Sequence, residues 1–256
     1  MKENYHTHTA RCRHATGTEE EYVLRAIDGG LEVLGFSDHT PFLFPNQYRS
    51  RIRMLPYELG DYVTSVLNLK EKYADKIDIH LGLEVEFYPD RMDDLKKLIS
   101  PFPMEYFILG QHWCGNEQDE IYMGWETEDK ALLQRYCDQC LTAMETGLFS
   151  YFAHPDLIQF VGDPDFYCKE TERLCRGALE CDVPLEINLT GIQFQRHYPR
   201  EKFWEIAGQV GCKVVIGCDA HAPDQVIMPE AEVKAMELVS KYNLQFLSSV
   251  PLRPCK

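Results

Sequence analysis

Short apolar, strand-like runs alternate with longer helical patterns along the whole of this 256-residue chain. Such alternation favours repeated βα units around a largely parallel sheet. The length is normal for one α/β barrel, and 45% hydrophobic residues suffice for a full core. Because no long linker, low-complexity tract or internal repeat interrupts the pattern, we expect a single domain over residues 1–256.

Eight segments have the length and composition of strands. They are residues 3–6, 32–37, 78–84, 105–110, 150–153, 184–188, 213–217 and 244–247. The helical patterns cover residues 18–29, 59–73, 91–99, 131–145, 171–180, 200–209 and 229–241. Thr18 and Glu21 have the capping-box spacing at the start of the first helix. The longest irregular stretch, roughly 40–56, would overhang the active face of a barrel.

Charge and cysteine content narrow the class of protein. The 26 basic and 41 acidic side chains leave a formal charge of −15, which disfavours duplex nucleic acid as a partner. A charged start and the absence of an apolar run of about 18 residues predict a cytosolic protein without a membrane segment. We expect the ten cysteines to be free thiols, and the pair Cys137 and Cys140 to be two thiols on a helix.

Histidines are the most informative residues for function. His6 and His8 form an H-x-H pair, which on an extended segment places two imidazole rings on the same side. Alone, such a short motif is a weak indication of metal binding. The wider pattern is stronger, because seven of the nine histidines belong to one set with two carboxylates. His80, inside a strand, and His197 lie outside it.

Most members of this set follow the C-terminal ends of predicted strands, where barrel enzymes keep their chemistry. They are His6, His8, His14, His39, Glu84, His112, His154, Asp219 and His221. A carboxylate that ends a buried strand, as Glu84 does, is costly unless it is paired or binds a metal. Imidazole with carboxylate suits zinc, manganese or iron, and ligands from five or more strands indicate two or three ions.

The ordered motifs resemble one family as a set. The chain reads H-T-H-T, C-x-H-A, G-F-S-D-H-T-P-F, G-L-E-x-E, L-G-Q-H-W, A-H-P-D and G-C-D-A-H between residues 5 and about 222. This order resembles the PHP (polymerase and histidinol phosphatase) superfamily, especially its histidinol-phosphate phosphatases. The resemblance implies a distorted (β/α)7 TIM-like barrel of the PHP type. Residues 244–247 would then be a terminal extension or an extra pairing.

The resemblance also implies a centre of three divalent transition-metal ions, with zinc, manganese and iron left open. The first ion would be held by His6, His8, Glu84 and Asp219. Glu84 would bridge to a second ion held by His112 and His154, and the third would be held by His14, His39 and His221. Asp38 resembles a carboxylate that orients a ligand imidazole.

The activity that the resemblance implies is hydrolysis of L-histidinol phosphate, a step of histidine biosynthesis, by a metal-bridging hydroxide. Where the family is expected to hold phosphate with basic residues, this chain has Gln159 and Gln193. The candidates to replace them are Arg196, Arg53 and, more weakly, His197, because guanidinium binds phosphate bidentately. Trp113 is a candidate to stack on an imidazole.

Two other functions stay open at this point. The same centre would also suit another small phosphate ester or a phosphotyrosyl protein, while the charge disfavours a nucleic-acid end. A non-catalytic metal-binding regulatory module is the other, although a lapsed site would be expected to lose at least one ligand. The sequence does not determine the oligomeric state.

Overall fold

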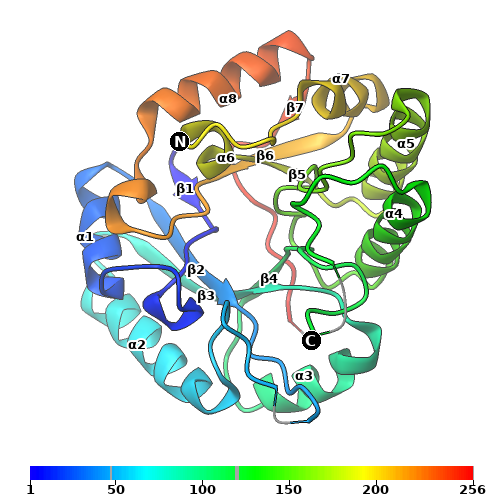
Figure 1. The fold of residues 1–256 in the computed structure, drawn as a ribbon. Coiled ribbons are helices and arrows are strands. Elements are labelled where there is room, and N and C mark those ends of the chain that lie inside the picture. The colour runs from blue at the N-terminus through cyan, green and yellow to red at the C-terminus, as the bar shows by residue number, and fades with distance from the viewer. Residues whose placement is uncertain (47, 119–120, 256) are drawn as a thin grey trace.

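The strands form a parallel barrel surrounded by helices (Figure 1). The computed structural model describes residues 1–46, 48–118 and 121–255. The strands are β1 (Glu3–Asn4), β2 (Val33–His39), β3 (Asp78–Val85), β4 (Tyr106–Leu109), β5 (Leu185–Asn188), β6 (Lys213–Gly217) and β7 (Gln245–Phe246). They pair in the orders β1-β2-β3-β4 and β5-β6-β7, and every pairing is parallel.

Isolated parallel bridges join the two sheets. Phe152 pairs with Leu109 at the end of β4 and with Leu185 in β5, and Thr7 pairs with Ala220 beyond the ends of β1 and β6. Seven segments therefore close into a distorted barrel, as expected. The strand predicted at 150–153 is reduced to the bridge at Phe152, because the chain turns at once into a left-handed residue, His154 (φ 33°).

The C-terminal segment covers the end of the barrel opposite the strands' C-terminal ends. β7 pairs with the first residues of β6, which makes it the extra pairing expected for 244–247. Figure 1 shows the chain then crossing the middle of the barrel. Val250 N donates to Glu3 Oε2 (3.1 Å), and Leu247 and Leu252 pack with Val250 against the interior cluster. That cluster contains Tyr5, Tyr106, Ile108, Tyr151, Ala153 and Val215.

The helices lie outside the barrel. They are α1 (Glu19–Asp28), α2 (Leu59–Lys72), α3 (Met92–Ile99), α4 (Lys130–Glu145), α5 (Pro164–Glu180), α6 (Leu189–Gln193), α7 (Glu201–Val210) and α8 (Pro229–Lys241). The capping box of Thr18 and Glu21 is present at α1. α5 begins at Pro164 rather than at residue 171, because the Asp163 side chain accepts from two backbone amides of its first turn. α6 was not predicted.

Two sequence expectations concern the cysteines and membrane helices. All ten cysteines lie in the described part of the chain, and all are free thiols, as expected. Cys137 and Cys140 are buried on α4, facing the core. Among the described residues, no helix has the length and apolar character that crossing a membrane requires.

Candidate metal centre

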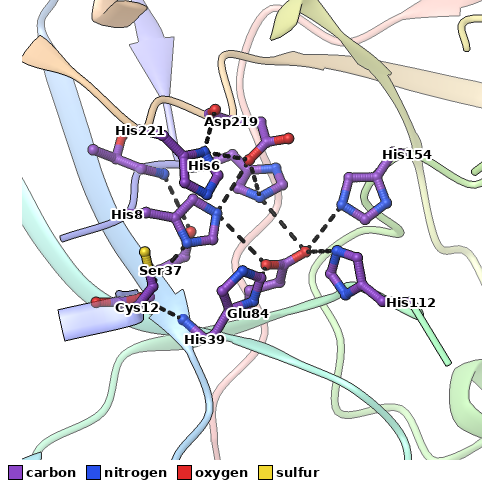
Figure 2. Close-up of polar contacts among 12 residues, drawn as sticks. His6, His8, Cys12, Ser37, His39, Glu84, His112, His154, Asp219 and His221 are labelled. Carbon is purple, nitrogen blue, oxygen red and sulfur yellow. Dashed lines mark hydrogen bonds and ion pairs between the residues drawn. The ribbon is translucent and has the colours of Figure 1, made fainter. Parts of the chain in front are cut away.

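The residues predicted to form the site converge at the C-terminal end of the barrel (Figure 2). β1 leads into His6 and His8, β2 ends at His39, and β3 contains Glu84. His112 follows β4, and His154 follows the bridge at Phe152. Asp219 and His221 follow β6. Parallel strands place all these positions at one face, so residues that are far apart in sequence lie together in a single cluster.

The Glu84 carboxylate lies at the centre of this cluster and is 1% exposed. In the described part of the chain, five histidines place a ring nitrogen within 4 Å of one of its oxygens. They are His6 (3.6 Å), His8 (3.6 Å), His39 (2.8 Å), His112 (3.7 Å) and His154 (3.0 Å). Glu84 is therefore placed to bridge two or more cations.

Ligand-type atoms gather in groups whose members lie within 4.8 Å of one another. The groups are His14, His39 and His221; His6, His8 and Asp219; His6, Glu84 and His154; His8, His39 and Glu84; and His8, Cys12 and His221. The first matches the set expected for the third ion. The second matches three of the four residues expected for the first ion. Cys12 was not predicted as a member of any group.

Carboxylates orient two of the imidazoles from behind. His6 Nδ1 lies 2.7 Å from Glu186 Oε1, and His112 Nδ1 lies 3.3 Å from Glu86 Oε1. A proton on each Nδ1 donates to the carboxylate and leaves the Nε2 lone pair facing Glu84. Glu186 is fully buried and also accepts from the backbone amide of His154 (3.0 Å). Both histidines are thereby held in the tautomer that a metal requires.

His14 and His221 face each other with their Nε2 atoms 2.9 Å apart. The Nδ1 of His14 donates to the Cys12 carbonyl (2.7 Å), and that of His221 to the Asp219 carbonyl (3.0 Å). With both Nδ1 atoms protonated, two lone pairs point at each other, which is unfavourable without a cation between them. Protonation does not resolve this, since burial and the neighbouring His8 lower the pKa of His221 to about 3.

Several buried polar atoms of the centre have no hydrogen-bond partner among the described residues. They are His6 Nε2, both ring nitrogens of His8, His39 Nδ1, Glu84 Oε2 and His154 Nδ1. Orphaned buried polar atoms are costly and are rare in native proteins. Of these atoms, His6 Nε2, His8 Nε2 and His39 Nδ1 lie within 3.6 Å of Glu84, which fits a site for metal ions that would satisfy them.

The electrostatics of the centre keep its carboxylates ionised. Burial raises the pKa of Glu84, but His39, His112 and His6 outweigh it and hold that pKa well below its usual range. Asp219 behaves in the same way: burial opposes His6 and His8, and the net pKa is also well below the usual range. Two anionic side chains therefore stand among the imidazoles, as a cation site needs.

The backbone makes room for these carboxylates. A Cβ atom at Gly110 would lie 1.9 Å from Glu84 Oε1, and one at Gly217 would lie 1.8 Å from Glu186 Oε1. Asp219 (φ 53°), like His154, adopts the left-handed region that non-glycine residues rarely occupy. Strained residues of this kind persist where function requires them.

Asp38 lies behind His8. Its Oδ1 is 3.6 Å from His8 Nδ1 and accepts from the His39 backbone amide (2.7 Å), while Thr9 donates its hydroxyl to Oδ2. The side chain is fully buried. At 3.6 Å the Asp38 carboxylate does not hydrogen-bond the His8 imidazole, so its role in orienting a ligand imidazole stays a prediction.

A cavity of about 580 Å³ opens over the centre. Its lining includes the imidazoles of His14, His39, His112, His154 and His221, together with Asp219. Of the residues proposed to contact substrate, Arg196 and Trp113 line this cavity. Arg196 donates to the Tyr198 hydroxyl (2.9 Å) and lies over that ring.

The other proposed substrate contacts lie elsewhere. Arg53 is 1% exposed and pairs with Glu86 (2.7 Å) and Glu117 (2.6 Å), so its position is inconsistent with direct phosphate binding. The buried carboxylates, which need a cation, draw it away from the cavity. His197 Nε2 bonds the Leu157 carbonyl (2.6 Å).

Neither glutamine is among the described residues that line the cavity over the centre. Gln159 donates to Glu126 (3.2 Å), and Gln193 is exposed beside a separate, smaller cavity that includes Asp224. Gln159 and Gln193 as substrate contacts therefore find no support in the described lining of the cavity.

Sequence reasoning singled out neither Glu186 nor Glu86 as a site residue. Glu186 is the second residue of the buried strand β5 (Leu185–Asn188), so the strand-end rule that marked Glu84 does not find it. A carboxylate inside a buried apolar strand is the signal that could have found it. Glu86 is fully buried and contacts His112, Arg53 and the Tyr88 hydroxyl. Its partner Arg53 comes from a loop, which no local pattern could reveal.

Fold and site together define a TIM-like barrel with an imidazole and carboxylate centre suited to metal ions. A model of the PHP domain matches residues 4–190. A probable histidinol-phosphatase of Deinococcus radiodurans is 32% identical over 230 residues, covering 86% of each chain, and one of Schizosaccharomyces pombe is 24% identical. The chain belongs to the PHP domain family.

Within that family it is of the histidinol-phosphatase type and is an enzyme of the phosphatase class. A solved structure supports the fold. The histidinol phosphate phosphatase of Lactococcus lactis, in complex with zinc, L-histidinol and phosphate, has a TM-score of 0.73 at 20% identity, covering 97% of this chain and 96% of that one. A putative histidinol phosphatase of Listeria monocytogenes has a TM-score of 0.72.

Proposed function

We propose that this protein hydrolyses L-histidinol phosphate to L-histidinol and phosphate at a centre of three divalent transition-metal ions. The observation that carries the proposal has two parts. His6 Nε2, His8 Nε2 and His39 Nδ1 are buried near Glu84 without hydrogen-bond partners among the described residues, and the Nε2 atoms of His14 and His221 face each other with opposed lone pairs. The relatives named as probable histidinol-phosphatases over 86% of the chain support the substrate.

The ligand assignment follows the groups of the site. His6, His8, Glu84 and Asp219 would hold one ion, Glu84, His112 and His154 a second, and His14, His39 and His221 a third. Imidazole and carboxylate ligands suit zinc, manganese or iron. The zinc in the Lactococcus lactis structure makes zinc the first metal to test.

The protein's own residues would orient the metal ligands and bind the phosphate group of the substrate. When bound, the ions supply Lewis acidity, which activates water and neutralises phosphate oxygens. Glu186 and Glu86 hold protons on the Nδ1 atoms of His6 and His112, so that the opposite nitrogens stay available as ligands. Arg196 is the one arginine or lysine among the described residues of the cavity lining, and we assign it to the phosphate oxygens.

Phosphate release and metal content, measured on the same sample, test this function. We expect strong preference for L-histidinol phosphate over a panel of phosphomonoesters, loss of activity on chelation, and recovery with added zinc or manganese. Arg196→Ala should raise KM by about tenfold or more. Turnover of other esters alone would favour a different phosphate ester as substrate.

No turnover with the metals fully loaded would favour a binding or regulatory module instead. A small phosphorylated substrate and no nucleic-acid partner are what the centre and the charge of −15 support. A cytosolic location and a single domain over residues 1–256 stay predictions.

A further inference from the structure

Aromatic side chains line the same cavity as the metal centre. Trp113, Tyr122 and Trp125 come from the segment after β4, and Phe194 and Tyr198 from the segment after α6. We call these five residues the aromatic lining. The rings of Trp113 and Tyr122 are 5.5 Å apart, and those of Tyr122 and Trp125 are 6.0 Å apart at 81°. A continuous series of rings thus leads away from His112.

Backbone pairing holds this series in place. Trp113 and Tyr122 form an antiparallel bridge, and the Met123 amide donates to the His112 carbonyl (2.8 Å). Tyr198 is buried and receives the Arg196 guanidinium on its hydroxyl. The rings are therefore preorganised beside the group that we assign to phosphate, and binding would cost little ordering.

The outer members of the aromatic lining are unusually exposed. Trp125 is 62% exposed and Phe194 is 53% exposed, although both line a cavity. Exposed apolar surface beside convergent polar groups marks ligand contact. A bound leaving group would cover these two rings.

The chemistry of the lining restricts that leaving group. Among the described residues of the lining, Asp219 is the one carboxylate, and its Oδ1 lies 3.1 Å from His8 Nε2 and 3.4 Å from His6 Nε2. It is therefore committed to the metal centre. A leaving group finds π faces here rather than a free anionic partner, and π faces favour flat rings by stacking.

We propose that the aromatic lining selects phosphate esters whose leaving group carries a flat, unsaturated ring, which Trp125 and Phe194 contact by stacking. The proposal deepens the proposed function and rests on it, since it takes the phosphate to be held beside Arg196 at the metal centre. The imidazole of L-histidinol is one such ring.

Two esters with equal alkoxide leaving groups test ring shape alone: 2-phenylethyl phosphate and 2-cyclohexylethyl phosphate. For the metal-loaded enzyme we expect kcat/KM to be about tenfold higher for the phenyl ester. In the double variant Trp125→Ala/Phe194→Ala the two values should come within about twofold. Phe246→Ala, an exposed aromatic at the opposite end of the barrel, should keep the tenfold preference.

Binding of L-histidinol gives a second readout that needs no turnover. Of the three tryptophans, Trp113 and Trp125 line the cavity and Trp204 is buried in α7, so fluorescence reports on the lining. We expect Trp125→Ala to weaken binding about tenfold and Trp125→Phe to restore most of it. Equal binding by wild type and Trp125→Ala would overturn the proposal.

The two proposals fail in different ways. Hydrolysis of L-histidinol phosphate with equal rates for both ring esters would overturn the role of the aromatic lining and leave the activity standing. A preference for the phenyl ester without hydrolysis of L-histidinol phosphate would support the lining and overturn the substrate. If no ester is hydrolysed, the fluorescence titration alone decides on the lining.

Discussion

The Nη2 atom of Arg53 lies 2.7 Å from Oε1 of Glu86, and both side chains are 1% exposed. The same Glu86 oxygen is 3.3 Å from His112 Nδ1, and the Arg53 Nε donates to Glu117 (2.6 Å). Arg53 also donates to the Thr40 carbonyl (3.3 Å). One buried guanidinium therefore ties the irregular segment after β2 to the segment after β4 and to a histidine of the metal centre.

Removing this guanidinium should destabilise the fold, because it leaves two buried carboxylates without a cation. For Arg53→Met we expect the free energy of unfolding to fall by about 3–5 kcal/mol in urea titrations of the metal-loaded protein. Arg53→Lys should lose less, since it keeps the charge but not the fork geometry. Arg51→Met, at an exposed position of the same segment, should stay within about 0.5 kcal/mol. A loss below about 1 kcal/mol for Arg53→Met would contradict the network.

Glu186 should control metal affinity through His6. Glu186→Ala removes the acceptor of His6 Nδ1 and of the His154 amide, so we expect metal affinity to fall by about 10–100-fold in chelator competition. Glu186→Gln, which keeps an acceptor oxygen, should lose less. Glu230→Gln, at an exposed site at the start of α8, serves as the control. Unchanged affinity in Glu186→Ala would show that the carboxylate does not orient the ligand.

Gly110→Ala should disable the centre without replacing any of its ligand residues. Its Cβ would overlap Glu84 Oε1, so the carboxylate must move away from the imidazoles. We expect loss of bound metal and at least a hundredfold loss of activity, measured by elemental analysis and phosphate release. Gly60→Ala in α2, whose Cβ would meet nothing nearer than 3.9 Å, should be neutral or slightly stabilising. Full metal content in Gly110→Ala would contradict the crowding.

Stability in acid should depend on Glu105, away from the metal centre. Burial opposes the bonds from His80, Lys70 and the Leu81 amide, and the net pKa of Glu105 is lowered to about 2. A lowered carboxyl pKa stabilises the fold above the unfolded value of about 4.5, and this contribution disappears as the pH falls through 2. We expect Glu105→Gln to cost about 1–2 kcal/mol at pH 6, after allowance for partial solvent exposure, and nothing near pH 2.

The unfolding free energies of the wild type and of Glu105→Gln, measured between pH 2 and 6 over the range in which both are folded, check this dependence. The exposed Glu180→Gln serves as the control and should give no pH-dependent difference. A constant difference across the range would mean that Glu105 acts by packing rather than by charge.

The strand-end pattern was readable from the sequence because it is local. Strand and helix periodicities span a few residues each, and parallel pairing then brings the C-terminal ends together without further information. The positions of Glu84, His112 and Asp219 at one face followed from that rule. The short segment around Phe152 was overestimated as a strand, because the left-handed turn at His154 that ends it has no glycine to mark it.

Arg53 shows the limit of what local sequence patterns can predict. Its partners Glu86 and Glu117 lie 33 and 64 residues away in sequence, and nothing in residues 40–56 indicates that its guanidinium is buried rather than free for phosphate. The long arginine side chain pairs with buried carboxylates, and those carboxylates come together only in the folded protein.

The sequence by itself determined the alternation of strands and helices, the ligand types and the strand ends at which they gather, since these depend on periodicity and on residues adjacent to strands. The distorted seven-stranded barrel was implied by the resemblance of its ordered motifs to a known family. The tertiary structure alone decided which carboxylates orient His6 and His112, that Arg53 lies outside the cavity, and that aromatic rings flank Arg196. Those relationships depend on packing between segments distant in sequence, where the cost of burying an unpaired charge selects the partners.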